Sequence, residues 1–267
     1  MPVVEVTEVA AGVRLLTLNR PDSLNAMNHE LVAGFHDALD AADGDHACRV
    51  VVVTGAGRGF CAGLDLKGAG AAPNTEGAGR PQAGMLAQQH IASLVTHMRA
   101  TRKPIIAAVN GPAAGGGLAL ALACDVRVAA RSARFNVAFV RIGLSGCDVG
   151  VSYLLPRIVG VSRAFELMLT GRFVGAEEAE RIGLVSRVVP DGEVVEAALE
   201  IAGQIRANSP FGIWMTKEVM WSNLEASSLQ AAIDLENRTQ ILTTFTEDMP
   251  EAMRAFLEKR EPRFGNR

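Results

Sequence analysis

Hydrophobic residues along this chain follow two periods, and these divide the chain into short strands and helices. Residues 3–9 and 13–18 alternate apolar and polar side chains, which predicts the two strands of a hairpin turned at residues 11–12. Residues 49–54 are apolar almost throughout, as in a strand that a sheet buries on both faces. Further extended segments are expected at 104–109, 125–130, 133–139 and 184–188.

Between these strands the apolar positions recur every three or four residues, which predicts helices. The first, at 27–42, carries Leu31, Phe35 and Leu39 on one face. Others are expected at 82–100, 148–159, 163–169, 176–182 and 193–207, with Pro156 bending or ending the first part of its helix. From Ser209 onward the pattern is almost entirely helical. We therefore expect an α/β core at residues 1–205 and a helical region at 206–267.

Charge and hydropathy exclude two classes of partner. With 26 Lys and Arg against 29 Asp and Glu, the formal charge is -3, so there is no basic footprint for nucleic acid and no polybasic patch for a membrane. No run of about 18 apolar residues occurs, and the start of the chain lacks the pattern of a secretory leader. We therefore expect a cytoplasmic protein.

The cysteines and histidines give no sign of a metal site. Cys48, Cys61, Cys124 and Cys147 form no C-x-x-C pair, so buried free thiols in a reducing compartment are expected. The histidines show no ligand spacing, and those in the helix at 82–100 are expected to be packing or surface residues. We predict no metal and no cofactor separate from the substrate.

Three glycines open a helix in the middle of the chain. Gly115, Gly116 and Gly117 follow the strand at 104–109 and precede a Leu/Ala series with high helix propensity. The first N–H groups of a helix have no partner within it, and the helix dipole adds partial positive charge there. An oxygen of a ligand can approach, either a phosphate or a carbonyl that becomes an oxyanion. The alternative is a tight turn that packs the helix against the strand.

A second glycine-bearing loop, at 55–66, follows the strand at 49–54. A strand followed by such glycines also fits a dinucleotide-binding turn, but that motif requires a long amphipathic helix directly afterwards. Residues 68–84 are instead rich in Ala, Gly and Pro and indicate a loop. The sequence therefore favours a different use for this turn.

Taken together, these motifs give a family resemblance. They are Gly-Phe-Cys-Ala-Gly-Leu-Asp-Leu at 59–66, Asn-Gly-Pro-Ala-Ala-Gly-Gly-Gly at 110–117, Arg-Pro at 20–21 with Leu-Asn-Ala at 24–26, Leu-Thr-Gly-Arg at 169–172, Gly-Leu-Val at 183–185 and Phe-Leu-Glu-Lys-Arg at 256–260. In this order the chain resembles the enoyl-CoA hydratase/isomerase (crotonase) family over its whole length. The resemblance implies a crotonase-like spiral of ββα turns with a C-terminal helical trimerisation region. It also implies an acyl-CoA substrate and a homotrimer or dimer of trimers.

The resemblance further implies an oxyanion hole made by the backbone N–H groups of Leu64 and Gly116. A backbone donor does not titrate, and the one at Gly116 has the helix dipole behind it. Contacts with the acyl-CoA are implied for Ala26, Ala62, Gly63, Asp65, Leu66, Gly115, Ala119, Phe139 and Lys259. Lys259 would contact phosphate, if need be on a neighbouring subunit, and its alternative role is a solvated surface charge.

The two glutamates with which hydratases of this family add water are replaced. Matching the motifs places Ala119 and Phe139 at their positions, and neither side chain moves a proton. Asp148, eight residues before Pro156, instead resembles the single catalytic carboxylate of the peroxisomal type of Δ3,Δ2-enoyl-CoA isomerase. Its alternative role is a helix N-cap. Apolar neighbours expected at Phe139, Leu144, Val149 and Val151 favour a carboxylate that acts as a base.

Three functions stay open on these residues. The first is double-bond isomerisation of an enoyl-CoA with Asp148 as acid and base, because one carboxylate suffices to move a proton from C2 to C4. The second is hydration, or other enolate chemistry, by an altered set of residues. The third is a trimer that binds acyl-CoA without turning it over.

Overall fold

The computed structural model describes residues 1–265. The strands are β1 (Val4–Ala10), β2 (Val13–Leu18), β3 (Val50–Gly55), β4 (Ile105–Val109), β5 (Ala113–Ala114), β6 (Val126–Ala130), β7 (Arg134–Asn136), β8 (Val174–Gly175) and β9 (Arg187–Val189). The helices are α1 (His29–Gly44), α2 (Arg80–Ala100), α3 (Gly116–Ala123), α4 (Val151–Val159), α5 (Val161–Thr170), α6 (Ala176–Arg181), α7 (Val194–Arg206), α8 (Pro210–Asn223), α9 (Leu229–Thr244), α10 (Asp248–Glu258) and the short η1 (Pro21–Ser23) and η2 (Ala138–Ile142).

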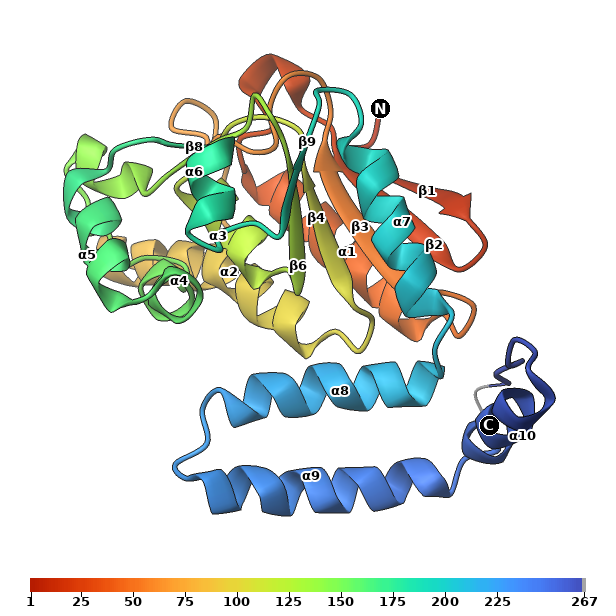
Figure 1. The fold of residues 1–267 in the computed structure, drawn as a ribbon. Coiled ribbons are helices and arrows are strands. Elements are labelled where there is room, and N and C mark those ends of the chain that lie inside the picture. Colours follow the sequence, from red (N-terminus) through yellow and green to blue (C-terminus); the bar gives the residue numbers. More distant parts are fainter. Residues whose placement is uncertain (266–267) are drawn as a thin grey trace.

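The main sheet holds six strands in the order β1-β2-β3-β4-β6-β9 (Figure 1). β1 pairs with β2 in the antiparallel sense, which confirms the hairpin predicted over 3–18, and every later pair is parallel. The hairpin turn holds Gly12 at φ 72°, a left-handed conformation that glycine adopts without steric cost. Because β3 and β4 are parallel neighbours, the segments that follow them leave the sheet at the same edge.

Burial on both faces explains why the run at 49–54 is apolar. Val51 and Val53 belong to the core that α1, α2 and α3 cover, whereas Val50 and Val52 pack against α7 on the opposite face. All four side chains are fully buried. Helices therefore cover both faces of the main sheet, as the run predicts.

A second sheet, β5-β7-β8, continues the path of the chain beyond the main sheet. β5 follows β4 and pairs with β7, which in turn follows β6. The chain thus passes from a strand of the main sheet to a short strand and then to a helix, as in β4-β5-α3. This repeat is the ββα spiral that the family resemblance implies.

Several element boundaries differ from the sequence prediction. The segment expected to be extended at 133–139 is a strand only over Arg134–Asn136, and the chain enters η2 at Ala138. Helix α4 begins at Val151 rather than at 148, and Pro156 lies inside it without ending it. The last strand begins at residue 187 rather than 184, because Leu184 and Val185 both donate their N–H groups to the carbonyl of Ala179 in α6 (2.8 and 3.3 Å). Apolar residues in a turn that closes a helix give the same pattern as a strand.

The cysteines are free thiols, as expected, but they are not all buried. Burial raises the pKa of Cys61 and Cys124 to about 12, so these two are inert packing residues. Cys147 is exposed, and for this residue the prediction of burial was wrong. Its N–H donates to Ser145 Oγ (3.1 Å) in the turn before α4.

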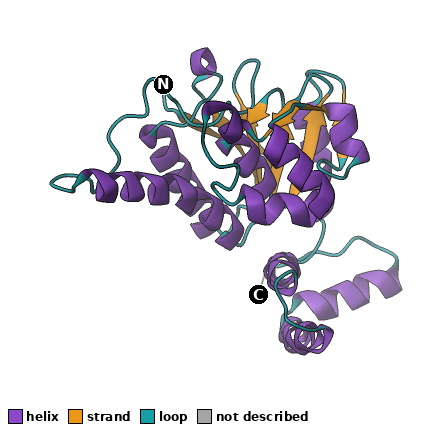
Figure 2. Cartoon of the chain, turned by 90° about the vertical axis from the view of Figure 1, so that its left-hand side faces the viewer, coloured by secondary structure: helices purple, strands orange, loops and turns teal. Residues whose placement is uncertain are grey.

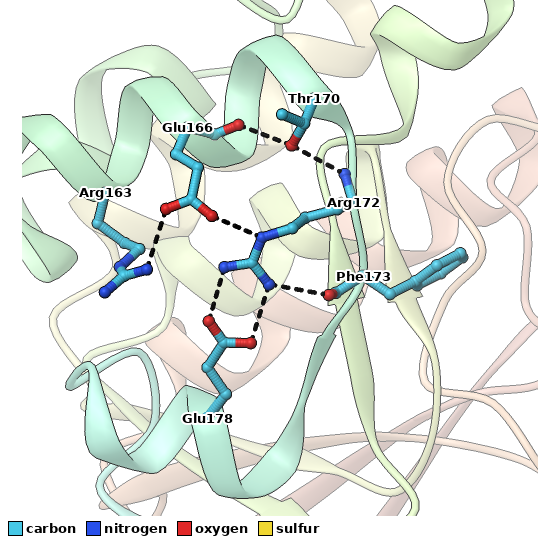
Figure 3. A network of polar contacts seen from close by, with 6 residues as sticks. All are labelled: Arg163, Glu166, Thr170, Arg172, Phe173 and Glu178. Atoms are coloured by element: carbon cyan, nitrogen blue, oxygen red, sulfur yellow. Dashed lines mark hydrogen bonds and ion pairs between the residues drawn. The ribbon is translucent and has the colours of Figure 1, made fainter.

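Arg172 fastens α5 to α6 (Figure 3). Its guanidinium donates to both oxygens of Glu178 (2.7 and 2.9 Å) and to Glu166 Oε1 (2.7 Å). These hydrogen bonds favour the charged forms and hold the pKa of both carboxyls below the ordinary value. Next to it, a Cβ on Gly171 would lie 2.8 Å from Val140 Cγ2. The end of α5 is therefore pressed against η2 and steadies the loop that leads to α4.

The last three helices stand apart from the sheet (Figures 1 and 2). α8 is anchored to the core by Lys217, whose Nζ lies 2.9 Å from Asp125 Oδ2, and by Trp221 Nε1, which donates to Asp125 Oδ1 (2.9 Å). Asp125 therefore has a structural role. Beyond this anchor α8, α9 and α10 expose large apolar side chains, among them Met220, Leu229, Ile241, Phe245, Met253 and Phe256. Apolar surface of this extent is typical of a protein interface, which supports the predicted subunit contact.

A row of histidines lies between α1 and α2, where their rings pack against one another, as expected for the two that belong to α2. His29 and His36 belong to α1, and His90 and His97 belong to α2. The ring centroids of the pairs His29–His90, His36–His90 and His36–His97 are 5.3, 6.1 and 5.0 Å apart. The spacing of histidines within one helix does not reveal which side chains a second helix places beside them, so this row could not be predicted.

The surroundings of the row disfavour a positive charge on it. Burial, and after it the neighbouring His90, lowers the pKa of His29, while burial, His97 and His90 lower the pKa of His36. Asp40 and Asp37 act on the pKa of His36 in the opposite direction without cancelling the effect. Asp40 Oδ1 also lies 3.2 Å from His97 Nε2. The native state therefore resists protonation of His29 and His36.

We expect the free energy of unfolding to fall as the pH decreases below about 6.5, the ordinary pKa of histidine. The unfolded chain takes up protons that His29 and His36 resist in the native state, so this contribution is complete above that pH and is lost as the pH drops towards the lowered pKa values. Urea unfolding between about pH 5 and about pH 8 measures the slope. His36→Asn should flatten it, whereas His46→Asn, at an exposed histidine outside the row, should not. An equal slope in the two variants would contradict this assignment.

Candidate active site

The two glycine-bearing turns meet at the edge of the main sheet. Cys61 and Ala113 form a β-bridge, and the N–H of Ala114 donates to the carbonyl of Cys61 (3.0 Å). The approach is close, because a Cβ on Gly117 would lie 2.0 Å from the same carbonyl oxygen. Only glycine permits this contact, so the third glycine of the triplet joins the start of α3 to the upstream turn.

The N–H of Leu64 is directed away from the strand beside it. Met27 donates its N–H to the carbonyl of Gly63 (2.7 Å) and accepts one from Asp65 (2.9 Å). In such a parallel bridge the intervening residue, Leu64, turns its own N–H to the opposite side. Gly63 has φ 98°, and a Cβ on it would lie 3.4 Å from the nitrogen of Gly116. The turn before Leu64 is therefore next to the N–H of Gly116.

Gly116 is the first residue of α3, so its N–H has no partner within the helix. Gly115 before it has φ 51° and ψ -116° and donates its own N–H to the carbonyl of Asn136 (3.0 Å). Within residues 1–265, neither the N–H of Leu64 nor that of Gly116 donates to a protein acceptor. The structure thus brings two unpaired donors to adjoining turns, although their role as an oxyanion hole stays a prediction.

Two asparagines hold the upstream turn in place. Asn25 is fully buried, and its Nδ2 donates to the carbonyls of Ala56 (2.9 Å) and Gly59 (2.8 Å). Asn110 Nδ2 donates to the carbonyls of Gly55 (2.9 Å) and Gly57 (3.0 Å), and its Oδ1 accepts the N–H of Gly55 (3.1 Å). Both residues stand in the motifs that gave the resemblance, and the structure shows their physical role.

Asp65 is paired and is not a free base. Its Oδ2 lies 2.8 Å from Arg20, which also donates to the carbonyl of Ala26. The hydrogen bond from Arg20, and after it the N–H groups of Lys67 and Gly68, hold the pKa of the Asp65 carboxyl below its ordinary value. The carboxylate therefore shapes the turn that carries Leu64.

The other residues predicted to contact substrate around this turn also lie together. Ala62 donates its N–H to the carbonyl of Leu24 (3.0 Å), next in sequence to the buried Asn25 and Ala26. Leu66 is exposed and available to a ligand. The proximity of Ala26, Ala62, Gly63, Asp65 and Leu66 agrees with one binding surface, while their contacts with coenzyme A stay predicted.

A cavity of about 360 Å³ opens beside Leu64. It lies between the first turns of α2 and the loop that follows Leu64, and small or apolar residues form most of its wall. Its lining consists of His29, Leu64, Ala69, Gly70, Ala72, Thr75, Ala83, Gly84, Ala87, Gln88 and Ile91. A largely apolar hollow lined by Leu64, the residue that carries one of the unpaired N–H donors, has the character of a site for an acyl group.

Asp148 is connected to this cavity through Gln88. The Asp148 Oδ1 accepts hydrogen bonds from Gln88 Nε2 and from the N–H of Val149 (2.8 Å). The alternative role of Asp148 as the helix N-cap was wrong, because Gly150 occupies the N-cap position of α4. The side chain of Asp148 is instead directed to α2, where Gln88 lines the hollow beside Leu64.

The apolar surroundings expected of Asp148 are present in part. Phe139, Val149 and Val151 are buried, but Leu144 is 54% exposed and forms no wall. Leu144 donates its N–H to the carbonyl of Phe139 (3.0 Å), which closes η2 and turns the side chain outward. The carboxylate therefore lies at the rim of the apolar core rather than inside it.

The positions matched to the hydratase glutamates hold apolar side chains at the site. Ala119 is buried in the first turn of α3 and donates its N–H to the carbonyl of Gly115 (3.0 Å). Phe139 Cε1 lies 3.4 Å from the position of a Cβ on Gly115. Both residues thus flank the glycine triplet and neither supplies a proton, while their contact with substrate stays a prediction.

Lys259 is not brought to the two turns within this chain. It ends α10 with φ 54° and is exposed, and α10 lies beyond α8 and α9, away from α3 (Figure 1). A phosphate contact by this residue would therefore require a neighbouring subunit.

Several residues in or next to the wall of the cavity were not predicted from the sequence as site residues. Gln88, His29 and Thr75 line it, and the Met27 side chain reaches Gly116, with Cε 2.3 Å from the position of a Cβ on that glycine. Helical periodicity placed Gln88 on a helix, yet nothing in its spacing indicated a partner as distant in sequence as Asp148.

Comparison with known proteins decides the family. The model of the enoyl-CoA hydratase/isomerase family matches residues 8–267. The chain belongs to this family. A protein of Mycobacterium bovis named probable enoyl-CoA hydratase is 47% identical over 93% of this chain and 88% of its own. The 1,2-epoxyphenylacetyl-CoA isomerase of Escherichia coli is 39% identical over 97% of each chain.

Among solved structures, a probable enoyl-CoA hydratase/isomerase of Mycobacterium abscessus superimposes with a TM-score of 0.95, at 41% identity, over the whole of both chains. The crotonase fold expected from the motifs is thereby confirmed. Membership in the enoyl-CoA hydratase/isomerase family implies an acyl-CoA substrate.

Two further properties of residues 1–265 bear on partners. No cluster of three or more His, Cys, Asp or Glu side chains in this part of the chain could hold a metal ion. None of the helices described here has both the length and the apolar character needed to cross a membrane.

Replacing Gly117 should disrupt the contact between the two turns. In Gly117→Ala the new Cβ would lie 2.0 Å from the Cys61 carbonyl oxygen, so the backbone must shift. We expect a loss of about 2 kcal/mol or more in the free energy of unfolding. Gly203→Ala is the matched control, because it lies in α7 with nothing within 4 Å of its Cβ position.

The control should gain up to about 1 kcal/mol, since alanine has the higher helix propensity. Thermal and urea unfolding measure both variants. If Gly117→Ala were as stable as Gly203→Ala, the close contact between the turns would not exist.

Proposed function

We propose that the protein moves a double bond in an enoyl-CoA thioester, with Asp148 as the acid and base and the N–H groups of Leu64 and Gly116 as the oxyanion hole. The observation that carries the proposal is the Gln88 side chain, which lines the cavity beside Leu64 and donates to the Asp148 carboxylate. It connects a carboxylate to the place where an acyl group would lie.

The reaction needs few protein groups. The Asp148 carboxylate takes a proton from C2 of a 3-enoyl thioester, and the electron pair delocalises onto the thioester oxygen. The two N–H donors hold that oxygen while it carries the charge, and losing one such donor typically costs about 3 kcal/mol of barrier. Asp148 then returns the proton at C4, which leaves a 2-enoyl thioester and restores the carboxylate.

Hydration fits these residues less well. Adding water requires one group to activate the water and another to protonate the α-carbon. The positions that the family resemblance assigns to those groups hold Ala119 and Phe139. A solved structure of a monofunctional enoyl-CoA isomerase from Mycobacterium smegmatis, 43% identical to this chain, supports the choice of isomerisation.

Hydration is the second candidate, because the relative from Mycobacterium bovis is named a probable hydratase. In that case Asp148 would have to activate the water. Crotonyl-CoA as substrate separates the two functions, since only hydration yields 3-hydroxybutyryl-CoA from it.

Assembly and location complete the proposal. A homotrimer or dimer of trimers would cover the apolar side chains that α8, α9 and α10 expose, and would give Lys259 a route to the acyl-CoA of a neighbouring subunit. The four free cysteines favour a reducing compartment such as the cytoplasm.

Asp148→Asn tests the proposed base. The amide does not accept the C2 proton, so conversion of a 3-enoyl-CoA to the 2-enoyl-CoA should fall about 10²- to 10⁴-fold. Binding of the CoA ester, measured by calorimetry, should stay within a few-fold. The matched control is Asp191→Asn, at an exposed turn where the carboxylate accepts the N–H of Ser132 (2.9 Å), and it should keep full activity.

Each other outcome has a distinct meaning. Unchanged turnover in Asp148→Asn would remove Asp148 from the mechanism. Formation of 3-hydroxybutyryl-CoA by the natural protein would replace isomerisation with hydration. Tight binding of several acyl-CoA esters without turnover of any would replace catalysis with acyl-CoA binding.

A further inference from the structure

We propose that Gln88 is a positioning residue, which together with the N–H of Val149 fixes the Oδ1 atom of Asp148 and leaves Oδ2 to transfer the proton. The proposal rests on the function assigned to Asp148 above. It specifies in addition which oxygen of the Asp148 carboxylate transfers the proton, and it assigns the orientation of that carboxylate to a side chain of α2.

The first observation is the unequal bonding of the two carboxylate oxygens. Oδ1 accepts two hydrogen bonds, from the Gln88 amide and from the N–H of Val149. Within residues 1–265 no hydrogen bond or ion pair involves Oδ2. Two donors on one oxygen draw charge to it and prevent rotation of the carboxylate, so the other oxygen has free lone pairs in a fixed direction.

The second observation is the backbone at Val149. This residue has φ 38°, a left-handed conformation that is a genuine outlier for a β-branched side chain. The side chain is nevertheless buried in the core. The unusual turn directs the Val149 N–H back to the carboxylate of the preceding residue. Strain of this kind persists where the surrounding structure imposes it, and it concentrates at functional sites.

The third observation is the place of Gln88 in α2. One turn further along the helix, Ile91 is buried and lines the same cavity, which fixes the orientation of this face of α2. The Gln88 side chain is exposed to the cavity and spans from it to the loop before α4. Gln88 therefore lines the cavity and also donates a hydrogen bond to the Asp148 carboxylate.

The chemistry explains why an amide suits this position. Transfer of a proton from C2 to C4 requires one oxygen to reach two carbons while the rest of the carboxylate stays still. A lysine or arginine would pair with the carboxylate and suppress its basicity. The amide of Gln88 donates without carrying a charge, so Asp148 is oriented and remains able to accept a proton.

Gln88→Met tests this inference, because methionine has nearly the same length and lacks the donor. We expect kcat for isomerisation of a 3-enoyl-CoA to fall about 10- to 100-fold, the usual effect of losing a hydrogen bond to a charged group or of misplacing a reacting group. KM should change less than about threefold, since the thioester oxygen keeps its donors. The matched control is Gln89→Met, on the same helix but outside the cavity, and it should match the natural protein.

The pH profile separates orientation from a loss of structure. Removing a hydrogen bond to the carboxylate makes it a stronger base, so the pH at which kcat falls to half on the acid side should rise in Gln88→Met. Gln89→Met should leave this pH unchanged. Thermal unfolding of both variants shows whether α2 is intact, and an equal decrease of kcat in both would overturn the assignment.

A second readout distinguishes failure of this inference from failure of the proposed function. Exchange of the C2 proton of a saturated acyl-CoA into D₂O reports base action alone. If the natural protein shows neither exchange nor isomerisation, the proposed function and this inference both fall. If it shows both, and Gln88→Met does so at the same rate and with the same pH profile, only the role of Gln88 is refuted.

Discussion

The contact between the backbone at Gly117 and the carbonyl of Cys61 is the constraint on which this structure depends. Two parallel strands, β3 and β4, end at one edge of the sheet, and the turns that follow them approach until no side chain fits between them. Hydrogen bonds from Asn25 and Asn110 hold the turn after β3, and the complete burial of α3 holds the turn after β4. The site is therefore built mainly of backbone, supported by the central core of the protein.

A site built of backbone determines the chemistry that suits it. The N–H groups of Leu64 and Gly116 are neutral at every pH, so the negative charge that they would stabilise is carried by the substrate. The protein adds a carboxylate at the rim of the core, and the side chains that flank the glycine triplet, Ala119 and Phe139, are apolar. This division between fixed neutral donors and one mobile proton is the physical basis for choosing isomerisation.

The sequence predicted what local patterns encode. Alternation in the hairpin, the apolar run of β3 and the glycines before α3 report on neighbouring residues, and the structure confirms these elements. Contacts between distant segments carry no such signal. The Gln88–Asp148 bond and the histidine row depend on how α2 packs against the loop before α4 and against α1. Cys147 and Leu144 differed from expectation because apolar residues also occur in exposed turns, and Leu184 differed because a buried turn that closes a helix uses the same residue types as a strand.

The wall of the cavity beside Leu64 is made largely of alanine and glycine, at positions 69, 70, 72, 83, 84 and 87. These residues leave the cavity open because alanine has only a methyl side chain and glycine has none. A single substitution at any of these positions would introduce a larger side chain. The volume of this cavity is thus adjustable in steps of a methyl group, while the sheet, the two turns and Asp148 remain untouched. Related chains can differ in the size of the cavity and still keep the same fold around it.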